Sequence, residues 1–519
     1  NRSFINKINM RRRNFLQATG LLPFMGKQLV AENAFAAAQQ KTPPAGDREF
    51  FYRPENAWAV DFIPFYANGE FQLFYLHDWR DPQRHGEGTP WYRISTNDFV
   101  HFKEHGEMLK RGSKTEQDLM VWTGSVIQAK NEFHIFYTGY NPSFKQLGKP
   151  AQGIMHAVSQ DMVNWTKFPE QTFFAPSDKY EKHDWRDPFV FWNSDTNEYN
   201  MLLAARYKKG IPRRRGLTAL CSSKDLINWK AQDAFYSPDR YYTHECPDLF
   251  KIGDWWYLVF SEFTDKMRTR YCMSRSLKGP WRSPERDDFD GHAFYAAKSA
   301  SDGKSRFLFG WNPTRGNASD NGDWGWGGNL VVHELYQQKN GELGVKIPST
   351  VAAAFNKTSP VSFGSGTGKF SYNNGILVLD ARETFAAAVA GTQPDLCSIS
   401  ATVKFKKGVR EFGLMFHTSE DLEKSYYIRI EPANSRVVFD KWPRERREVF
   451  QMVELERPLK LADGDNVKMT VIIDGNKGVA YLNDVIAMNF RAYDLPAGNW
   501  GFFTCDGESS FSNIAMKTL

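Results

Sequence analysis

The sequence has few cysteines, and none of them forms a recognisable pair. The five in 519 residues are Cys221, Cys246, Cys272, Cys397 and Cys505. No two have the short spacing of a structural zinc site, and their number is too low for a disulfide framework. We therefore expect a fold that is stabilised by its hydrophobic core.

Long apolar runs and the common catalytic motifs are also absent from the sequence. No run approaches the roughly 20 apolar residues that a membrane-spanning helix needs, so we expect no membrane span. There is no glycine-rich phosphate loop, no H-E-x-x-H and no G-x-S-x-G, and the eleven histidines lack ligand-like spacing. The sequence therefore predicts neither a cofactor nor a metal.

Little excess charge remains once the N-terminus is set aside. The formal net charge is +6, but residues 1–36 contain six Lys or Arg and one acid, which leaves 60 basic and 59 acidic residues elsewhere. This balance gives no electrostatic reason to expect binding to nucleic acid or to an anionic membrane.

The basic N-terminus has the features of an export signal. A twin-arginine patch, Arg11-Arg12-Arg13-Asn14-Phe15-Leu16, is followed by a modestly apolar stretch and by Ala34-Phe35-Ala36, an A-x-A cleavage pattern. We predict a twin-arginine-type signal over 1–36, a linker over 37–49, and a periplasmic or extracellular protein. The alternative is a disordered basic tail.

The chain is rich in aromatic residues (15%), and these mark a repeat. A short strand-like segment of aromatic and apolar residues recurs along the chain at intervals of 62, 66, 57 and 51 residues. The landmark aromatic residue of each copy is Phe71, Phe133, Tyr199, Trp256 or Phe307. Five units of strands and turns with almost no helical periodicity predict an all-β protein, with a five-bladed β-propeller over 50–347. A large irregular β-sandwich would explain the strands but not the spacing.

The repeat stops where the composition shifts to Ala, Ser, Thr and Gly, and we predict a linker at 348–361. Residues 362–519 alternate as short strands separated by turns such as Asp474-Gly475 and Asn483-Asp484. This pattern predicts a C-terminal antiparallel β-sandwich.

Three acids precede apolar strands at similar places in their units. Asp61, Asp187 and Glu245 lie 10, 12 and 11 residues before their landmark aromatics. If the first strand of every blade lines the central channel, the three carboxyl groups meet at one mouth of it. Paired carboxyl groups with separated pKa values can hydrolyse a glycosidic bond. Taken singly, Asp187 could instead be a buried partner of Arg186, and Glu245 could stabilise a strand end.

Four motifs resemble glycoside hydrolase family 32, the invertase, inulinase and levanase group. They are Trp122-Thr123-Gly124-Ser125, Arg186-Asp187-Pro188, Glu245-Cys246-Pro247, and Phe294-Tyr295-Ala296-Ala297 followed by Phe309-Gly310-Trp311. The resemblance implies a nucleophile at Asp61, a transition-state stabiliser at Asp187 and an acid/base at Glu245. It also implies retention at a terminal β-fructofuranosyl unit. The side chains expected to bind the sugar are Trp58, Trp122, Ser125, Arg186, Tyr295 and Trp311.

The first blade departs from that family. The family has Asn-Asp-Pro-Asn-Gly where this chain has Val60-Asp61-Phe62-Ile63-Pro64, and Leu76 replaces a Gln. Asp78 and Arg80 are candidate replacement contacts. Because buried polar groups set sugar specificity, a glycosidase acting on arabinofuranosides or xylosides is an alternative, as is a non-catalytic carbohydrate-binding propeller. We expect a carbohydrate partner; the sequence leaves the sugar, the linkage and the oligomeric state open.

Overall fold

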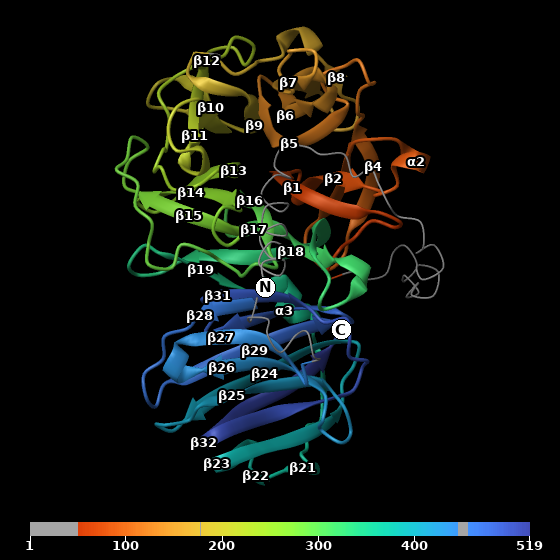
Figure 1. Cartoon of the computed structure of the whole chain (residues 1–519), viewed down its shortest axis with the longest axis vertical. Helices are drawn as coiled ribbons and strands as arrows, with labels where there is room; N and C mark the ends of the chain where they lie inside the picture. The colour runs from red at the N-terminus through yellow and green to blue at the C-terminus, as the bar shows by residue number, and fades with distance from the viewer. Residues whose placement is uncertain (1–49, 177, 445–454) are drawn as a thin grey trace, which may run out of the picture.

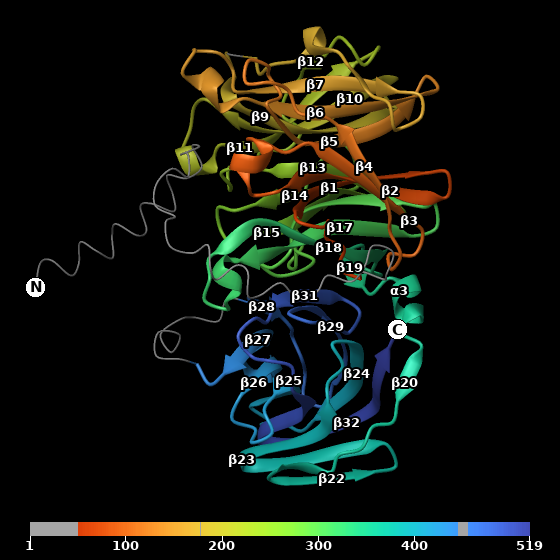
Figure 2. The same cartoon turned by 90° about the vertical axis from the view of Figure 1, so that its right-hand side faces the viewer.

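The computed structural model describes residues 50–176, 178–444 and 455–519, and it is built almost entirely of β-strands. Figures 1 and 2 show a propeller stacked end to end on a sandwich. The predicted fold class, an all-β chain with a propeller followed by a β-sandwich, is confirmed. The predicted export signal and first linker (1–49) lie outside the described residues. No helix within the described ranges is long and apolar enough to cross a membrane.

The propeller consists of five successive antiparallel meanders. The first and the last are joined in one sheet, where Ala59 lies opposite Gly328. The meanders are β1 (Trp58–Ala67), β2 (Glu70–Asp78), β3 (Trp91–Thr96) and β4 (Lys103–Leu109); β5 (Met120–Ala129), β6 (Glu132–Tyr140), β7 (Gln152–Ser159) and β8 (Thr166–Lys167); β9 (Tyr180–Asn193), β10 (Glu198–Tyr207), β11 (Gly216–Ser223) and β12 (Lys230–Ala231); β13 (Glu245–Ile252), β14 (Trp255–Glu262) and β15 (Arg268–Ser274); and β16 (Tyr295–Ser301), β17 (Arg306–Arg315), β18 (Trp324–Gln337) and β19 (Leu343–Lys346).

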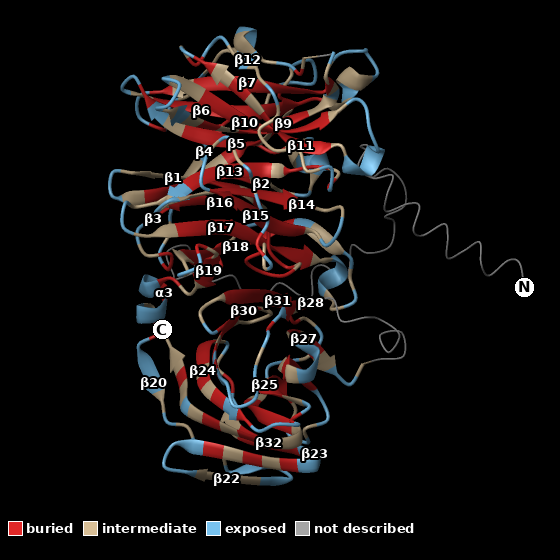
Figure 3. Cartoon of the chain, turned by 90° about the vertical axis from the view of Figure 1, so that its left-hand side faces the viewer, coloured by how far each residue is buried: buried red, intermediate tan, exposed pale blue. Residues whose placement is uncertain are grey.

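The first strands of the five meanders form the inner wall of the propeller. β1 contacts β5, β5 contacts β9, β9 contacts β13, β13 contacts β16, and β16 contacts β1, so the ring closes. Figure 3 shows that the propeller strands are mostly buried, as expected for sheets packed face to face on both sides. Such a ring is what the predicted five-bladed arrangement requires, and it directs residues of five distant segments toward one axis.

The same tight turn follows a strand in each of the first three meanders, at Asp98, Asp161 and Asp225. Oδ1 of Asp161 accepts hydrogen bonds from the backbone N–H groups of Val163 and Asn164, both at 2.8 Å. Asp98 and Asp225 make the same pair of bonds in their own meanders. An Asp side chain that accepts hydrogen bonds from the following backbone N–H groups in this way ends the strand and forms a turn.

The sandwich is organised around two long strands, β23 and β32, which run antiparallel through both of its layers. The predicted linker 348–361 contains α3 (Ser349–Ala354) and β20, and β20 pairs with β32. The strands are β20 (Lys357–Ser359), β21 (Ser365–Thr367), β22 (Lys369–Asn373), β23 (Ile376–Thr392), β24 (Leu396–Phe405), β25 (Glu411–Thr418), β26 (Ser425–Glu431), β27 (Arg436–Trp442), β28 (Leu455–Pro458), β29 (Asn466–Asp474), β30 (Lys477–Leu482), β31 (Ile486–Arg491) and β32 (Asn499–Thr518).

A buried polar network joins the two parts. Asp290, 2% exposed, accepts hydrogen bonds from the backbone of Asn489 at 2.8 Å and lies 3.0 Å from Nε2 of His333. Arg457 donates to the carbonyl oxygen of Asp290 at 2.6 Å and pairs with Asp288 at 2.8 Å. Although burial opposes ionisation, the bonds from His333 and Asn489 hold the pKa of Asp290 below its ordinary value. Because every member of this network depends on its partners, the propeller and the sandwich are held in one arrangement.

Candidate active site

The three predicted acids come together inside the ring. Asp61 lies on β1, Asp187 on β9, and Glu245 is the first residue of β13. The charge of Asp61 interacts with both Asp187 and Glu245, so the three carboxyl groups lie close together inside the propeller. Residues from three separate meanders therefore form one site.

A β-bulge lies at the same place in each of the five inner strands, where two residues oppose one on the neighbouring strand. Asp61 and Asp187 occupy these bulges with φ of 44° and 62°, as do Cys246 and Ala296 with φ of 50° and 52°. Bulges redirect side chains and are frequent beside active sites, and a positive φ is unusual for residues other than glycine. The bulged pairs are Asp61-Phe62, Trp122-Thr123, Asp187-Pro188, Cys246-Pro247 and Ala296-Ala297.

The bulges correct one detail of the sequence interpretation. Glu245 precedes its bulge by one residue, so it occupies the position of Arg186 and Tyr295, whereas Asp61 and Asp187 are equivalent to Cys246. The three acids therefore do not hold one structural position. Asp61 and Asp187 lie on the bulges, and Glu245 reaches them from the adjoining position.

Arg186 connects two of the acids. Its Nη2 donates to Oε1 of Glu245 at 3.0 Å, and its Nε lies 3.8 Å from Oδ2 of Asp187. Its other amino group donates to Asp184 at 2.8 Å. Burial disfavours the guanidinium charge, but Glu245 and the two aspartates more than offset this and raise the pKa of Arg186. Arg186 is therefore a permanent cation within the site.

Asp187 is held from three sides. Its backbone N–H donates to Oγ1 of Thr138 at 2.8 Å, and its Oδ2 accepts from the backbone N–H of Cys246 at 3.0 Å. Burial raises its pKa to about 6, and the charge of Glu245 acts in the same direction, while Arg186 opposes the rise. The alternative that Asp187 merely neutralises Arg186 does not explain its position, since Arg186 makes closer contacts with Asp184 and Glu245.

Each of the other two acids has an aromatic partner from the last meander. The hydroxyl of Tyr295 donates to Oε2 of Glu245 at 2.6 Å. The indole Nε1 of Trp311 donates to Oδ1 of Asp61 at 3.0 Å. Burial, followed by the charge of Asp187, raises the pKa of Asp61 to about 8. Tyr295 and Trp311 were predicted to bind the sugar; at 4% and 0% exposure, they lie against the acids.

A buried lysine that sequence reasoning missed completes the charge pattern. Lys298, on β16 and 2% exposed, donates from Nζ to the carbonyl oxygen of Gly124 at 2.7 Å, and its charge interacts with Asp187 and Asp61. Two cations, Arg186 and Lys298, thus face three carboxyl groups. Because uncompensated buried charge is costly, the set favours keeping one proton among the three carboxyl groups.

Three more of the predicted binding residues line a hollow of about 270 Å³ at the rim, Asp78, Arg80 and Trp122, together with Trp79 and the 44% exposed Trp326. Arg80 donates to Oγ1 of Thr314 at 2.9 Å and to the carbonyl oxygen of Trp326, so it bridges the first and last meanders. The helix α2 (Pro82–His85) forms the outer edge of this hollow.

Trp58 and Ser125, both expected to bind the sugar, make contacts within the protein. The ring of Trp58 lies under the guanidinium of Arg80, at 4.9 Å from its centroid. Ser125 is 5% exposed, and its Oγ accepts the backbone N–H of Val190 at 3.1 Å, which ties β5 to β9. Within the described residues, no cluster of three or more His, Cys, Asp or Glu has the arrangement of a metal site.

The comparisons with known proteins agree with this fold. The profile of the Glycosyl hydrolases family 32 N-terminal domain matches residues 52–343, and that of the family 32 C terminal matches residues 373–518. A propeller carrying convergent acids defines the class of the protein, a glycoside hydrolase. More particularly, the chain belongs to glycosyl hydrolase family 32.

Curated relatives and solved structures extend this result. The chain is 21% identical to the Arabidopsis thaliana beta-fructofuranosidase, insoluble isoenzyme CWINV1, over 73% of its own length and 72% of that protein. It is 27% identical to a levanbiose-producing levanase of Bacillus subtilis, over 54% of its length and about half (51%) of that protein. The structure of the Bombyx mori GH32 beta-fructofuranosidase BmSUC1 aligns with a TM-score of 0.66 at 16% identity, covering 94% and 97% of the two chains. The fructan 1-exohydrolase IIa from Cichorium intybus aligns with a TM-score of 0.67 at 15% identity, covering 91% and 98%.

Proposed function

We propose that the chain is an exported, retaining exo-glycosidase that releases terminal β-fructofuranosyl units from oligosaccharides or polysaccharides. The observation that carries the proposal is the meeting of Asp61, Asp187 and Glu245, the last two in contact with Arg186, on strands of a family 32 propeller. The names of the relatives, which include beta-fructofuranosidases and levanases, support the fructosyl glycon. The twin-arginine pattern of residues 1–36 supports export.

In the first step, Asp61 attacks the anomeric carbon and Glu245 protonates the departing glycosidic oxygen. The bond from Trp311 uses Oδ1 of Asp61, so we assign the attack to Oδ2. A covalent fructosyl ester forms as the glycosidic bond breaks. Arg186 stabilises ionised Glu245. The hydroxyl of Tyr295 can donate a hydrogen bond to ionised Glu245 and accept one from protonated Glu245. Glu245 can therefore keep its contact with Tyr295 in both protonation states.

In the second step, Glu245 takes a proton from water, which attacks the same carbon and releases both the sugar and Asp61. Two inversions give overall retention. Asp187 is assigned to bind sugar hydroxyl groups and to stabilise the positive charge that develops on the ring. The bond that its carboxylate accepts from the N–H of Cys246, and the bond that its own N–H donates to Thr138, fix Asp187 before the sugar enters, which is the preorganisation that electrostatic stabilisation requires.

The first meander favours a second candidate glycon. Val60 and Phe62, which flank Asp61, are both completely buried in the core, so neither presents an amide to a sugar hydroxyl. Arabinofuranosides or xylosides are therefore alternatives, hydrolysed with inversion if a carboxylate activates water. The bridge from Arg80 to Thr314 and Trp326 supports a closed pocket for a terminal sugar under either assignment.

The test is to incubate the purified protein with sucrose, inulin, levan and aryl arabinofuranosides and to follow the products by NMR. We expect release of fructose with the β-configuration of the first-formed product retained. Asp61→Asn serves as the blank and should reduce the rate by more than about 10⁴-fold. Inversion would overturn the covalent role of Asp61, and failure to release sugar from any substrate would favour a binding propeller.

A further inference from the structure

The sandwich has a second apolar cluster on the outer face of one of its layers. Along β26, Tyr426 and Ile428 point into the main core, whereas Tyr427 between them belongs to a separate cluster. The same alternation along β25 and β32 assigns Met415 and Phe503 to that cluster. The outward face of an antiparallel sheet is ordinarily polar. The members of the cluster are at most 9% exposed, and the exposed aromatic side chains that border it mark a contact with something else.

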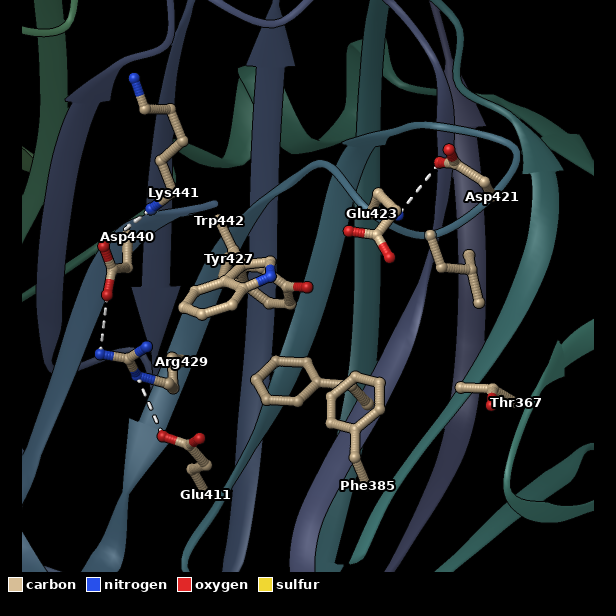
Figure 4. A pocket seen from close by; sticks show the side chains of 12 residues that line it. Thr367, Phe385, Glu411, Asp421, Glu423, Tyr427, Arg429, Asp440, Lys441 and Trp442 are labelled. Atoms are coloured by element: carbon tan, nitrogen blue, oxygen red, sulfur yellow. Dashed lines mark hydrogen bonds and ion pairs between the residues drawn. The ribbon is translucent and has the colours of Figure 1, made fainter. Parts of the chain in front are cut away.

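This patch is the floor of a hollow of about 470 Å³, which we call the sandwich hollow (Figure 4). The rings of Phe385 and Phe503 lie nearly parallel with centroids 6.0 Å apart, and Tyr427 meets Phe503 edge-on at 4.9 Å. Trp442, at the end of β27, projects beside Tyr427 and is 59% exposed, and Phe385 is 37% exposed. Trp442 and Phe385 are thus presented to solvent, next to the buried rings of Tyr427 and Phe503, which are 9% and 2% exposed.

The walls of the sandwich hollow are rich in hydrogen-bond acceptors. Arg429 pairs with Glu411 at 3.2 Å and with Asp440 at 2.8 Å, as the dashed lines of Figure 4 show, and with Glu431 at 2.9 Å. The other wall carries Asp421 and Glu423, and Lys441 is held by Asp494 at 2.7 Å. Among the described residues that line the hollow, acids therefore outnumber bases, and the guanidinium is already neutralised. The hollow does not suit an anion, but it suits a neutral molecule that carries many hydroxyl donors.

We propose that the sandwich hollow binds a neutral oligosaccharide or polysaccharide chain. The apolar C–H face of a sugar ring packs on an aromatic face, while its hydroxyl groups donate to ionised carboxylates, which are strong acceptors. The choice of fructan as probe rests on the proposed function of the propeller. A polymer held on the sandwich raises the local concentration of its free ends near the propeller, so the effect should be specific to long substrates.

The first test measures polymer binding without catalysis. The full chain carrying Asp61→Asn is compared with the same chain carrying Trp442→Ala and Phe385→Ala, using levan and inulin in affinity electrophoresis and calorimetry. We expect the hollow variant to bind polymer at least about tenfold more weakly. Trp192→Ala is the matched control, because Trp192 is a comparably exposed tryptophan (49%) on the propeller; this change should leave binding unaltered. Equal binding by the hollow variant, or no polymer binding by the parent chain, would overturn the proposal.

The second test uses the active chain and separates this site from the propeller. With Trp442→Ala and Phe385→Ala, we expect the KM for levan to rise severalfold while kcat/KM for sucrose stays unchanged. Trp442→Tyr, which keeps an aromatic face, should restore most of the polymer effect, and melting curves verify that each variant is folded. Should the active chain release no sugar while binding still depends on Trp442, the proposed function fails and the sandwich site stands. The reverse result, normal hydrolysis with an unchanged KM for polymer, removes the sandwich site alone.

Discussion

The indole N–H of Trp311 on β17 donates to Oδ1 of Asp61 on β1 at 3.0 Å. Trp311 is fully buried, so its edge fixes a carboxylate from the neighbouring meander and leaves no face for a sugar. Burial and the charge of Asp187 raise the pKa of Asp61, and the bond from Trp311 opposes this rise. Trp311 is therefore a positioning residue that also favours the ionised, nucleophilic form of Asp61.

Trp311→Phe should weaken catalysis and shift its pH dependence. A hydrogen bond to a charged group contributes about 1.5–3 kcal/mol, so we expect kcat/KM to fall about 10- to 100-fold. Because the bond lowers the pKa of Asp61, the decline of activity at low pH should begin at a higher pH. Trp165→Phe is the control, since the buried indole nitrogen of Trp165 has no hydrogen-bond partner among the described residues. A reduced rate with an unchanged pH profile would contradict the electrostatic role.

Asp61→Asn should abolish activity and stabilise the protein at alkaline pH. The pKa of Asp61 rises from 3.8 to about 8 on folding, so the folded state binds this proton more tightly than the unfolded chain. The free energy of unfolding therefore falls as the pH rises from about 4 to about 8. Asn carries no charge and avoids this loss, so we expect a gain of at least about 2 kcal/mol at pH 8.5, since each pKa unit corresponds to about 1.4 kcal/mol.

Chemical denaturation of both proteins at pH 4 and pH 8.5 measures this difference. The two stabilities should nearly converge at the lower pH, where Asp61 of the wild type is protonated in the folded protein and about half protonated in the unfolded chain. Asp195→Asn, at an exposed position, should change stability by less than about 0.5 kcal/mol at either pH. A variant that is less stable than the wild type at pH 8.5 would show that ionised Asp61 is not strained in the fold.

The positions of the acids could be predicted because a carboxylate within a buried strand is rarely there by chance. Asp61, Asp187 and Glu245 each interrupt or begin an apolar strand, and the repeat placed those strands in equivalent roles. The bulges could not be predicted, because an insertion of one residue in a strand pairing leaves no trace in hydrophobic periodicity. The acids lie 10, 12 and 11 residues before their landmark aromatics. Because this spacing already varies, it did not reveal that Glu245 is offset by one residue from the position of the two aspartates.

The partners of the acids were harder to predict than the acids themselves. Tyr295 and Trp311 were named as sugar contacts because aromatic residues suit both roles, and only the three-dimensional arrangement shows which edge or face is available. Lys298 follows the recognised fifth-blade motif by one residue, yet it was missed. Its hydrogen-bond acceptor, the carbonyl oxygen of Gly124, lies in the second meander, so nothing local in the sequence marks it.

Ser125→Ala tests whether the serine of the second-blade motif contacts sugar or supports the fold. Its Oγ accepts the backbone N–H of Val190 on β9 at 3.1 Å, and leaving a buried N–H without an acceptor costs about 1–3 kcal/mol. We expect thermal denaturation to show a loss of this size, with the KM for sucrose within about twofold of the wild type. An increased KM at an unchanged melting temperature would instead restore the predicted sugar contact.

Lys298→Met should alter the ionisation of the site while conserving side-chain volume. The charge of Lys298 lowers the pKa values of both Asp61 and Asp187, against the larger effect of their burial. Removal of this charge should raise both pKa values. The decline of kcat/KM at low pH should therefore move to a pH about one unit higher. At a fixed pH within the range of that decline, kcat/KM should be about tenfold lower than in the wild type. Lys167→Met is the control, because Lys167 pairs with Asp118 at 2.5 Å in the second meander, outside the three acids. Loss of stability without any change in the pH profile would mean that Lys298 serves only to hold Gly124 and the bulge of β5 in place.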